Sequence, residues 1–321
     1  MRHKAKIIAF SLCFVPFFIA LFPAGYASSL PDKTKKPVET AALSLNFSPY
    51  YIDGRDPEMG SPVSEAEMRA ALAAIAPYCD TIRTFGVTGE MTKLYKIARE
   101  EFGLRVIAGC WIGSGYTDAL VRQELQTMAD LANNGLVDIL LIGSEGLFRR
   151  DYTAAQLAGW ADTLRDLLQT PLPVGTSDTA YQLLQNADAL MTMDVIGFTY
   201  YPFFEKTHIT HALANFSEMH GQLKAAFDGK PLFCSESGWP DAGGSHGDAE
   251  PGPENAARYF EAIYAYSREQ NVEICYFEAL SESWKGKYGL AEKSFGLMDS
   301  GLMPKPHFSE PLKNILRQRE D

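Results

Sequence analysis

The 321-residue sequence lacks several motifs that mark common classes of binding site. It contains no CxxC pair and no HExxH motif, and no G-x-G-x-x-G turn follows its first strand-like run. His208 and His211 form an HxxH pair, but with no third ligand in view we interpret them as ordinary helix residues. The missing glycine-rich turn counts against the nucleotide-binding form of an open α/β sheet. We therefore expect no metal ion and no organic cofactor.

Cysteine is scarce. Four cysteines lie beyond the first 27 residues, and three of them fall within apolar, strand-like runs: Cys79, Cys110, Cys234 and Cys275. An even number in an exported protein would permit disulfides, whereas a domain of this size needs none, so buried free thiols fit the pattern at least as well. The sequence leaves both alternatives open.

Positive charge is also in short supply, with 29 Lys and Arg against 40 Asp and Glu and a formal net charge of −11. Loss of Arg2, Lys4 and Lys6 with an N-terminal signal would leave −14. Such a balance argues against nucleic acid or an anionic membrane surface as a partner and favours a neutral ligand. No obligatory protein partner is implied.

Only one long apolar run is present, from Ile7 to Phe22, and small residues around Ala27 follow it. With the preceding cations, this layout predicts a secretory signal peptide over residues 1–27 and hence an exported protein. The alternative is an uncleaved membrane anchor, for which the run is short and interrupted by Pro16. We predict a linker over residues 28–40 and a single domain over residues 41–321.

Short apolar runs alternate with longer amphipathic segments from Ala41 onward, a pattern typical of an α/β fold. The first amphipathic segment begins with a capping box, Ser64 to Glu67. Eight strands are predicted, over residues 42–47, 80–85, 105–111, 137–142, 173–176, 195–201, 231–235 and 273–277. Eight apolar strands separated by helices favour a closed (β/α)8 TIM barrel, with a doubly wound open sheet as the alternative.

Two of these strands end in an acidic residue. The run 136–145 reads LVDILLIGSE and ends at Glu145, and KPLFCSESGWPD places Glu236 where another apolar run meets Gly238. In a barrel, the carboxyl ends of the strands converge on one mouth. Two carboxyl groups about 5 to 5.5 Å apart are the machinery of a retaining glycosidase, in which one attacks as a nucleophile and the other donates a proton.

Aromatic residues gather at the same predicted strand ends: Tyr50, Tyr51, Phe85, Trp111, Tyr200, Tyr201, Trp239, Phe277 and Trp284. Aromatic faces stack against the C–H faces of sugar rings, so a mouth lined in this way suits a glycan. We expect Phe85 and Phe277 to belong to the core. Arg83 either bridges strand ends or helps to keep the nucleophile charged.

The segment SESGWP resembles the nucleophile signature of glycoside hydrolase family 17, the β-1,3-glucanases and related glucanosyltransferases. IGSEGLFR resembles the acid/base signature of that family, and the similarity continues through residues 82–86, 201–203 and 277–299. The resemblance implies a retaining enzyme acting on β-1,3-glucan by hydrolysis or transfer. It implies the following roles: Glu236 as nucleophile, Glu145 as acid/base, Tyr201 near the nucleophile, and Glu282, Lys285 and Glu292 as a charged group beside the site.

One position departs from the family pattern. Ser144 precedes the acid where the family usually has Asn, whose amide can hold the 2-hydroxyl of the sugar being cleaved. A hydroxyl offers fewer hydrogen bonds, so we expect this contact to be lost or bridged by water. The substitution motivates an alternative hypothesis, a non-catalytic β-glucan-binding protein on the same barrel. Ser281, where the family often has Asp, makes the role of Glu282 less secure.

Overall fold

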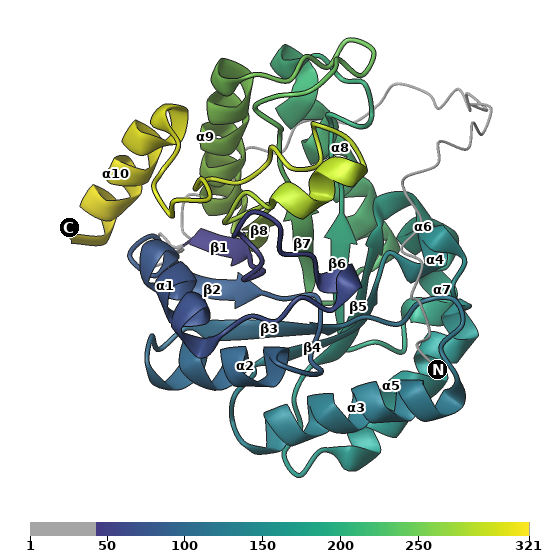
Figure 1. Ribbon diagram of the computed structural model, residues 1–321. Coiled ribbons are helices and arrows are strands. Elements are labelled where there is room, and N and C mark those ends of the chain that lie inside the picture. The colour runs from purple at the N-terminus through teal and green to yellow at the C-terminus, as the bar shows by residue number, and fades with distance from the viewer. Residues whose placement is uncertain (1–42, 321) are drawn as a thin grey trace, which may run out of the picture.

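Residues 43–320, which the computed structural model describes, are arranged around eight parallel strands that close into a barrel (Figure 1). The strands follow one another around the barrel in chain order, and pairing of the first strand with the eighth closes it. The predicted (β/α)8 barrel is therefore confirmed, and the open sheet is excluded. The predictions for residues 1–27 and 28–40 lie outside the described residues.

All eight predicted strands are present, with ends that shift by up to three residues. Their bounds are β1 (Leu43–Asn46), β2 (Cys79–Arg83), β3 (Arg105–Cys110), β4 (Ile139–Ser144), β5 (Val174–Thr179), β6 (Val195–Thr199), β7 (Leu232–Ser237) and β8 (Ile274–Tyr276).

Helices surround the barrel on its outside (Figure 1). They are α1 (Glu65–Ile75), α2 (Met91–Glu100), α3 (Asp118–Asn133), α4 (Gly146–Arg149), α5 (Ala154–Leu167), α6 (Ala180–Gln185), α7 (Ala187–Leu190), α8 (Ala212–Ala226), α9 (Pro253–Gln270) and α10 (Pro306–Glu320). Three short 3-10 helices, η1 (Pro57–Met59), η2 (Ile209–His211) and η3 (Ser283–Lys287), lie in the connections.

The start of α1 shows how local sequence sets an element boundary. Ser64 accepts a hydrogen bond from the backbone N–H of Glu67, and the Glu67 carboxylate accepts one from the backbone N–H of Ser64. This capping box satisfies two of the N–H groups that a helix start leaves unpaired. Within residues 43–320, no helix is both long and apolar enough to span a bilayer.

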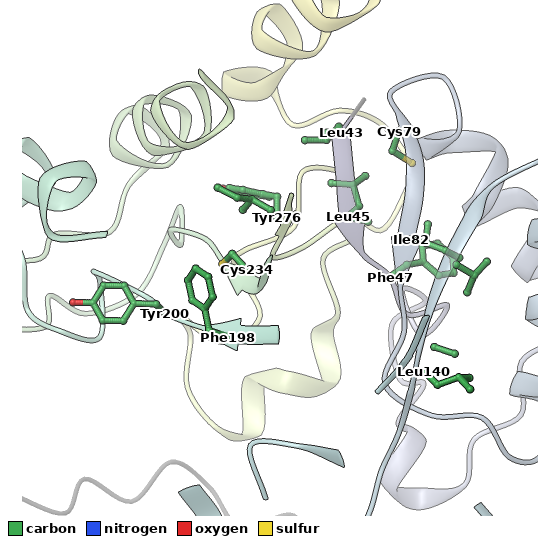
Figure 2. Packing of buried hydrophobic residues seen from close by; sticks show 14 of the residues in the cluster. Leu43, Leu45, Phe47, Cys79, Ile82, Leu140, Phe198, Tyr200, Cys234 and Tyr276 are labelled. Carbon is green, nitrogen blue, oxygen red and sulfur yellow. The ribbon is translucent and has the colours of Figure 1, made fainter. Parts of the chain in front are cut away.

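The core has two parts because side chains of a strand alternate between its two faces. Ile107 of β3 and Leu141 of β4 belong to a small cluster with four residues of β4, β6, β7 and β8, and such inward-facing side chains fill a barrel. Their sequence neighbours belong to the much larger cluster between barrel and helices. Figure 2 shows part of that cluster, with Leu45 of β1 near Cys79 and Ile82 of β2.

The cysteine question is settled within residues 43–320. All four cysteines there are free and buried: Cys79, Cys110, Cys234 and Cys275. Burial raises the pKa of the Cys79 thiol to about 12. Of the two alternatives that the sequence left open, buried free thiols are the correct one.

Candidate active site

Glu145 lies in a tight turn between β4 and α4. Its backbone is left-handed, with φ of 53°, a conformation that a residue with a side chain adopts at a cost of roughly 1 kcal/mol. The flanking glycines make this turn possible. A Cβ atom at Gly143 would lie 1.8 Å from the Tyr152 hydroxyl, and one at Gly146 would lie 2.1 Å from the Tyr152 ring. Tyr152 therefore packs directly against the turn that carries the glutamate.

Asp178 of β5 holds the start of α4 in place through hydrogen bonds. Its buried carboxylate accepts hydrogen bonds from the backbone N–H groups of Leu147, at 2.8 Å, and Phe148, at 3.2 Å. These are two of the N–H groups that a helix start leaves free, where negative charge is also favoured by the helix dipole. The position of Glu145 is thus fixed from β5 as well as from β4.

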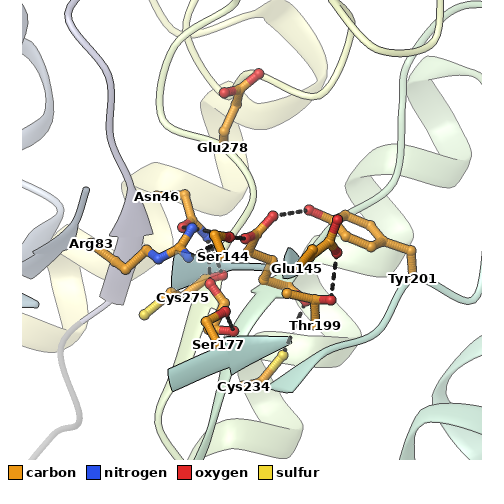
Figure 3. A network of polar contacts seen from close by, with 12 residues as sticks. Asn46, Arg83, Ser144, Glu145, Ser177, Thr199, Tyr201, Cys234, Cys275 and Glu278 are labelled. Atoms are coloured by element: carbon orange, nitrogen blue, oxygen red, sulfur yellow. Dashed lines mark hydrogen bonds and ion pairs between the residues drawn. The ribbon is translucent and has the colours of Figure 1, made fainter. Parts of the chain in front are cut away.

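Glu236 lies near the end of β7 and is 6% exposed. Its Oε1 accepts hydrogen bonds from Arg83, at 2.8 Å, and from Ser144, at 3.2 Å, while its Oε2 accepts one from the Tyr201 hydroxyl at 3.0 Å (Figure 3). Burial raises the pKa of Tyr201 well above its ordinary value, so its hydroxyl remains a donor. Both oxygens of Glu236 are thus held by hydrogen-bond donors, and one of these donors is the cation of Arg83.

Arg83 occupies the centre of this network and is completely buried. Besides Glu236, it donates to the Asn46 side-chain oxygen at 3.2 Å and to the Ser144 hydroxyl at 3.0 Å. The Asn46 amide in turn donates to the backbone carbonyls of Ser235, at 2.9 Å, and Cys275, at 2.8 Å. The guanidinium is therefore aimed from β2 at the nucleophile position by residues of β1 and β4.

Glu145 has different surroundings. Its carboxyl group accepts a hydrogen bond from the Thr199 hydroxyl on β6, at 2.6 Å (Figure 3). Burial, together with the negative charge of Glu236, raises the pKa of Glu145 to about 8. A carboxyl group with this pKa is protonated at neutral pH and can donate a proton.

Both glutamates line one cleft of about 680 Å³ at the mouth of the barrel, a volume in the range of ligand sites. Aromatic side chains form much of its wall: Tyr50, Phe85, Trp111, Phe148, Tyr201, Phe204, Phe277, Trp284, Tyr288 and Phe295. Phe85, which we expected to be a core residue, is partly exposed in the cleft, whereas Phe277 is buried as expected and also lines the cleft.

Trp239 is a correction in the other direction. It is fully buried, its indole N–H donates to the Glu250 carbonyl at 2.9 Å, and it packs against Phe203 and Tyr259 rather than lining the cleft. Its ring lies against Tyr259 of α9, on the helix side of the barrel. The preceding Gly238 passes close to the end of β8, since a Cβ there would lie 2.0 Å from the Phe277 carbonyl oxygen.

The charged group after β8 is assembled around Lys285. Its ammonium pairs with Glu282 at 2.7 Å and also with Glu278. Burial alone would lower the pKa of Lys285, but these two carboxylates raise it above its ordinary value. Ser48 donates to Glu282 at 2.5 Å, and Glu292 lines the cleft nearby, where burial raises its pKa. The three residues that the resemblance implied beside the site are therefore together.

Comparison with known protein families identifies the family of this chain. A model of the BtgE/BtgC glycoside hydrolase domain matches residues 44–296. The chain belongs to this family. This glycoside hydrolase is 27% identical over 318 residues to a glucan 1,3-beta-glucosidase of Schizosaccharomyces pombe, an alignment that covers 94% of the chain and 96% of the relative.

Solved structures show the same fold. A glycoside hydrolase family 17 β-1,3-glucanosyltransferase from Rhizomucor miehei has a TM-score of 0.72 and 24% identity, with 84% of this glycoside hydrolase and 97% of that chain covered. An endo-laminarinase from Formosa has a TM-score of 0.74 and 18% identity, covering 87% and 88% of the two chains.

Three polar residues of this site were not predicted from the sequence. Asn46, Thr199 and Glu278 each contact a member of the site, as described above. Asn46 and Thr199 had a visible signal, because each is a polar residue at the end of an apolar strand, as Glu145 and Glu236 are. Such a residue is buried only at a cost unless it finds a partner.

Proposed function

We propose that this glycoside hydrolase cleaves β-1,3-glucan by double displacement, with Glu236 as nucleophile and Glu145 as acid/base. Membership of the family supports the reaction class. The substrate is inferred from the relatives, which include a glucan 1,3-beta-glucosidase and a β-1,3-glucanosyltransferase whose active-site mutant was solved with laminaritriose. The observation that carries the mechanism is the opposite electrostatic setting of two glutamates in one cleft.

In the first step, a carboxylate oxygen of Glu236 attacks the anomeric carbon while protonated Glu145 gives its proton to the glycosidic oxygen. The bond between that carbon and oxygen breaks, and the leaving sugar departs as an alcohol. The donors around Glu236 fix the direction of its carboxyl group, which is the positioning that a nucleophile needs.

In the second step, Glu145 acts as a base. It takes a proton from a water molecule or from a glucan hydroxyl, whose oxygen attacks the anomeric carbon and releases Glu236 as a carboxylate. Water gives hydrolysis, and a glucan hydroxyl gives transfer. The high pKa of Glu145 suits both of its roles, because it is protonated before the first step and basic enough to accept a proton in the second.

Ser144 is accommodated within this mechanism. Its hydroxyl donates to Glu236 and accepts from Arg83, so its one proton is already committed to the nucleophile. It therefore supports Glu236 in place of holding a sugar hydroxyl. Both carboxylates and their network are retained, which favours an enzyme over the alternative of a binding protein.

The test uses laminarihexaose as substrate and mass spectrometry of the products. Turnover by the wild-type chain, with products longer than the substrate where transfer occurs, supports the proposal. Proton NMR of the first products must show the β-anomer, because two displacements retain configuration. A mechanism-based 2-fluoro sugar must label Glu236. Affinity for the oligosaccharide without turnover or labelling would instead establish the binding protein.

A further inference from the structure

Two loops on one side of the cleft are tied together by charged side chains. One follows β1 and contains η1, and the other follows β8 and contains η3. The Lys287 ammonium lies 2.8 Å from the Asp56 carboxylate and 2.6 Å from the Glu58 carboxylate, and the Tyr288 hydroxyl also donates to Glu58. We call these four residues the loop clamp. It joins segments about 230 residues apart in the sequence.

The clamp is more than a surface ion pair. Its side chains are partly withdrawn from water, with exposed fractions of 35% for Lys287, 21% for Asp56 and 14% for Glu58. Asp56 also caps η1, because its carboxylate accepts a hydrogen bond from the Glu58 backbone N–H at 2.9 Å. One lysine therefore holds two carboxylates that are already fixed by their own helix, so little ordering is required to form the contacts.

The clamp holds an aromatic corner against the cleft. Pro57 of the first loop and Trp284 and Tyr288 of the second all line the cleft and are partly exposed. The Lys287 ammonium lies 5.1 Å from the Trp284 ring centre and 5.2 Å from that of Tyr288. The two rings meet almost at a right angle, at 81° with centroids 6.4 Å apart.

The order of the strands indicates on which side of the reacting sugar this corner lies. Strands β4 and β8 lie on opposite sides of a closed barrel of eight strands in sequence order. Glu145 follows β4 and must lie beside the leaving oxygen. The corner, on loops after β8 and β1, therefore lies on the other side of the sugar that bonds to Glu236. That is the glycone side of the cleft.

The chemistry of the corner favours a neutral sugar. The loop clamp contains two carboxylates and one ammonium, so its net charge is negative and an anionic glycan would be repelled. Its three lining side chains are apolar or aromatic on the face toward the cleft, as the C–H faces of a glucose ring require.

We propose that Pro57, Trp284 and Tyr288 form a distal glucose-binding subsite on the glycone side, and that Lys287 positions it by pairing with Asp56 and Glu58. This rests on the proposed function, since the ligand is a glucosyl unit of the β-1,3-glucan chain. None of its three side chains takes part in the proposed displacement. Loss of the subsite therefore weakens binding of long substrates without slowing the chemical step.

The experiment compares KM and kcat for laminaritriose through laminarihexaose. For Lys287→Met, KM for the longest substrate rises about 5- to 10-fold, the effect of losing roughly 1 kcal/mol of uniform binding, while kcat stays within about twofold. KM for laminaritriose is unchanged. Lys287→Arg preserves the cation and restores the wild-type values. Lys313→Met removes an exposed lysine–glutamate pair on α10 and serves as the matched control, with no change at any length.

Two results would overturn the subsite. One is an equal rise in KM at every length, which indicates general damage to the cleft, and the other is no change at any length. Both require active wild-type protein, so they are distinct from failure of the proposed function, in which the wild-type chain turns over no laminari-oligosaccharide. Equal thermal unfolding midpoints for the variants and the control exclude loss of folding as the cause.

Discussion

Glu236 and Glu145 are the same residue type at the ends of two strands of one barrel, yet their surroundings are opposite. Glu236 receives hydrogen bonds on both oxygens, one from the buried cation of Arg83. Glu145 is desolvated, faces the charge of Glu236 and is bonded by the neutral hydroxyl of Thr199. Residue type supplies the carboxyl group, and neighbours from other strands determine its hydrogen bonds and the charges that it faces.

The largest effects are expected from removing the carboxyl groups themselves. Glu236→Ala eliminates the covalent path and lowers kcat for laminarihexaose by more than about 10⁴-fold, whereas Glu145→Gln lowers it by about 10²- to 10⁴-fold. An aryl glycoside whose leaving group needs no proton separates the two. Its first step survives in Glu145→Gln and is lost in Glu236→Ala. Initial rates with both substrates provide the measurement.

If both variants lose the first step equally with the activated aryl substrate, the assignment of acid and nucleophile is wrong. A Glu236→Gln variant serves as the steric control, because it keeps the shape of the side chain without a nucleophilic carboxylate.

Removal of the cation tests what makes the Glu236 side different. Arg83→Met leaves a buried carboxylate without its charged partner, so we expect kcat/KM to fall about 10²-fold. Arg83→Lys keeps the charge and should recover part of the rate. Initial rates on laminarihexaose provide the measurement, and an unchanged rate in Arg83→Met would contradict the role given to the guanidinium.

The surroundings of Glu145 are tested by the basic limb of the pH profile of kcat/KM. Because its pKa is raised to about 8 and the first step needs its proton, kcat/KM should decline as pH rises through about 8. Thr199→Val removes a hydrogen bond that lowers this pKa, so its basic limb should move upward by up to about one pH unit. A downward shift would contradict the role given to Thr199.

The smallest effect concerns stability. The folded chain keeps a proton on Glu145 that the unfolded chain loses above its ordinary pKa of 4.5, so this group reduces stability as pH rises from 4.5 to about 8. Glu145→Gln has no such proton. It should match the wild-type unfolding midpoint near pH 4 and exceed it by a few degrees at pH 8, as measured by calorimetry. A gain that is the same at both pH values would point to packing instead.

The barrel and both glutamates were predictable because they depend on local pattern. Apolar runs of strand length recur between amphipathic segments, and an acid that ends such a run stands out. The segment between β5 and β6 shows the limit, since the alternation of strands and helices gives no sign that it is divided at Asn186 into α6 and α7.

What the sequence could not provide is the pairing across the barrel. Arg83 and Glu236 are 153 positions apart, and Lys287 and Glu58 are 229 apart. No local pattern encodes which residues meet at such separations. The prediction for Trp239 was wrong for another reason: the sequence pattern indicates where the strand ends, but not that the next aromatic side chain packs against Phe203 and Tyr259.

Asn46 of β1 contacts both the neighbouring strands of the barrel and the active-site network. One end of its side chain spans the carbonyls of β7 and β8, and the other receives the guanidinium that serves the nucleophile. Deamidation at this position would replace the bridging N–H groups by a carboxylate that repels both carbonyls and competes with Glu236 for Arg83. A single amide therefore couples the closure of the barrel to the charge balance around the nucleophile.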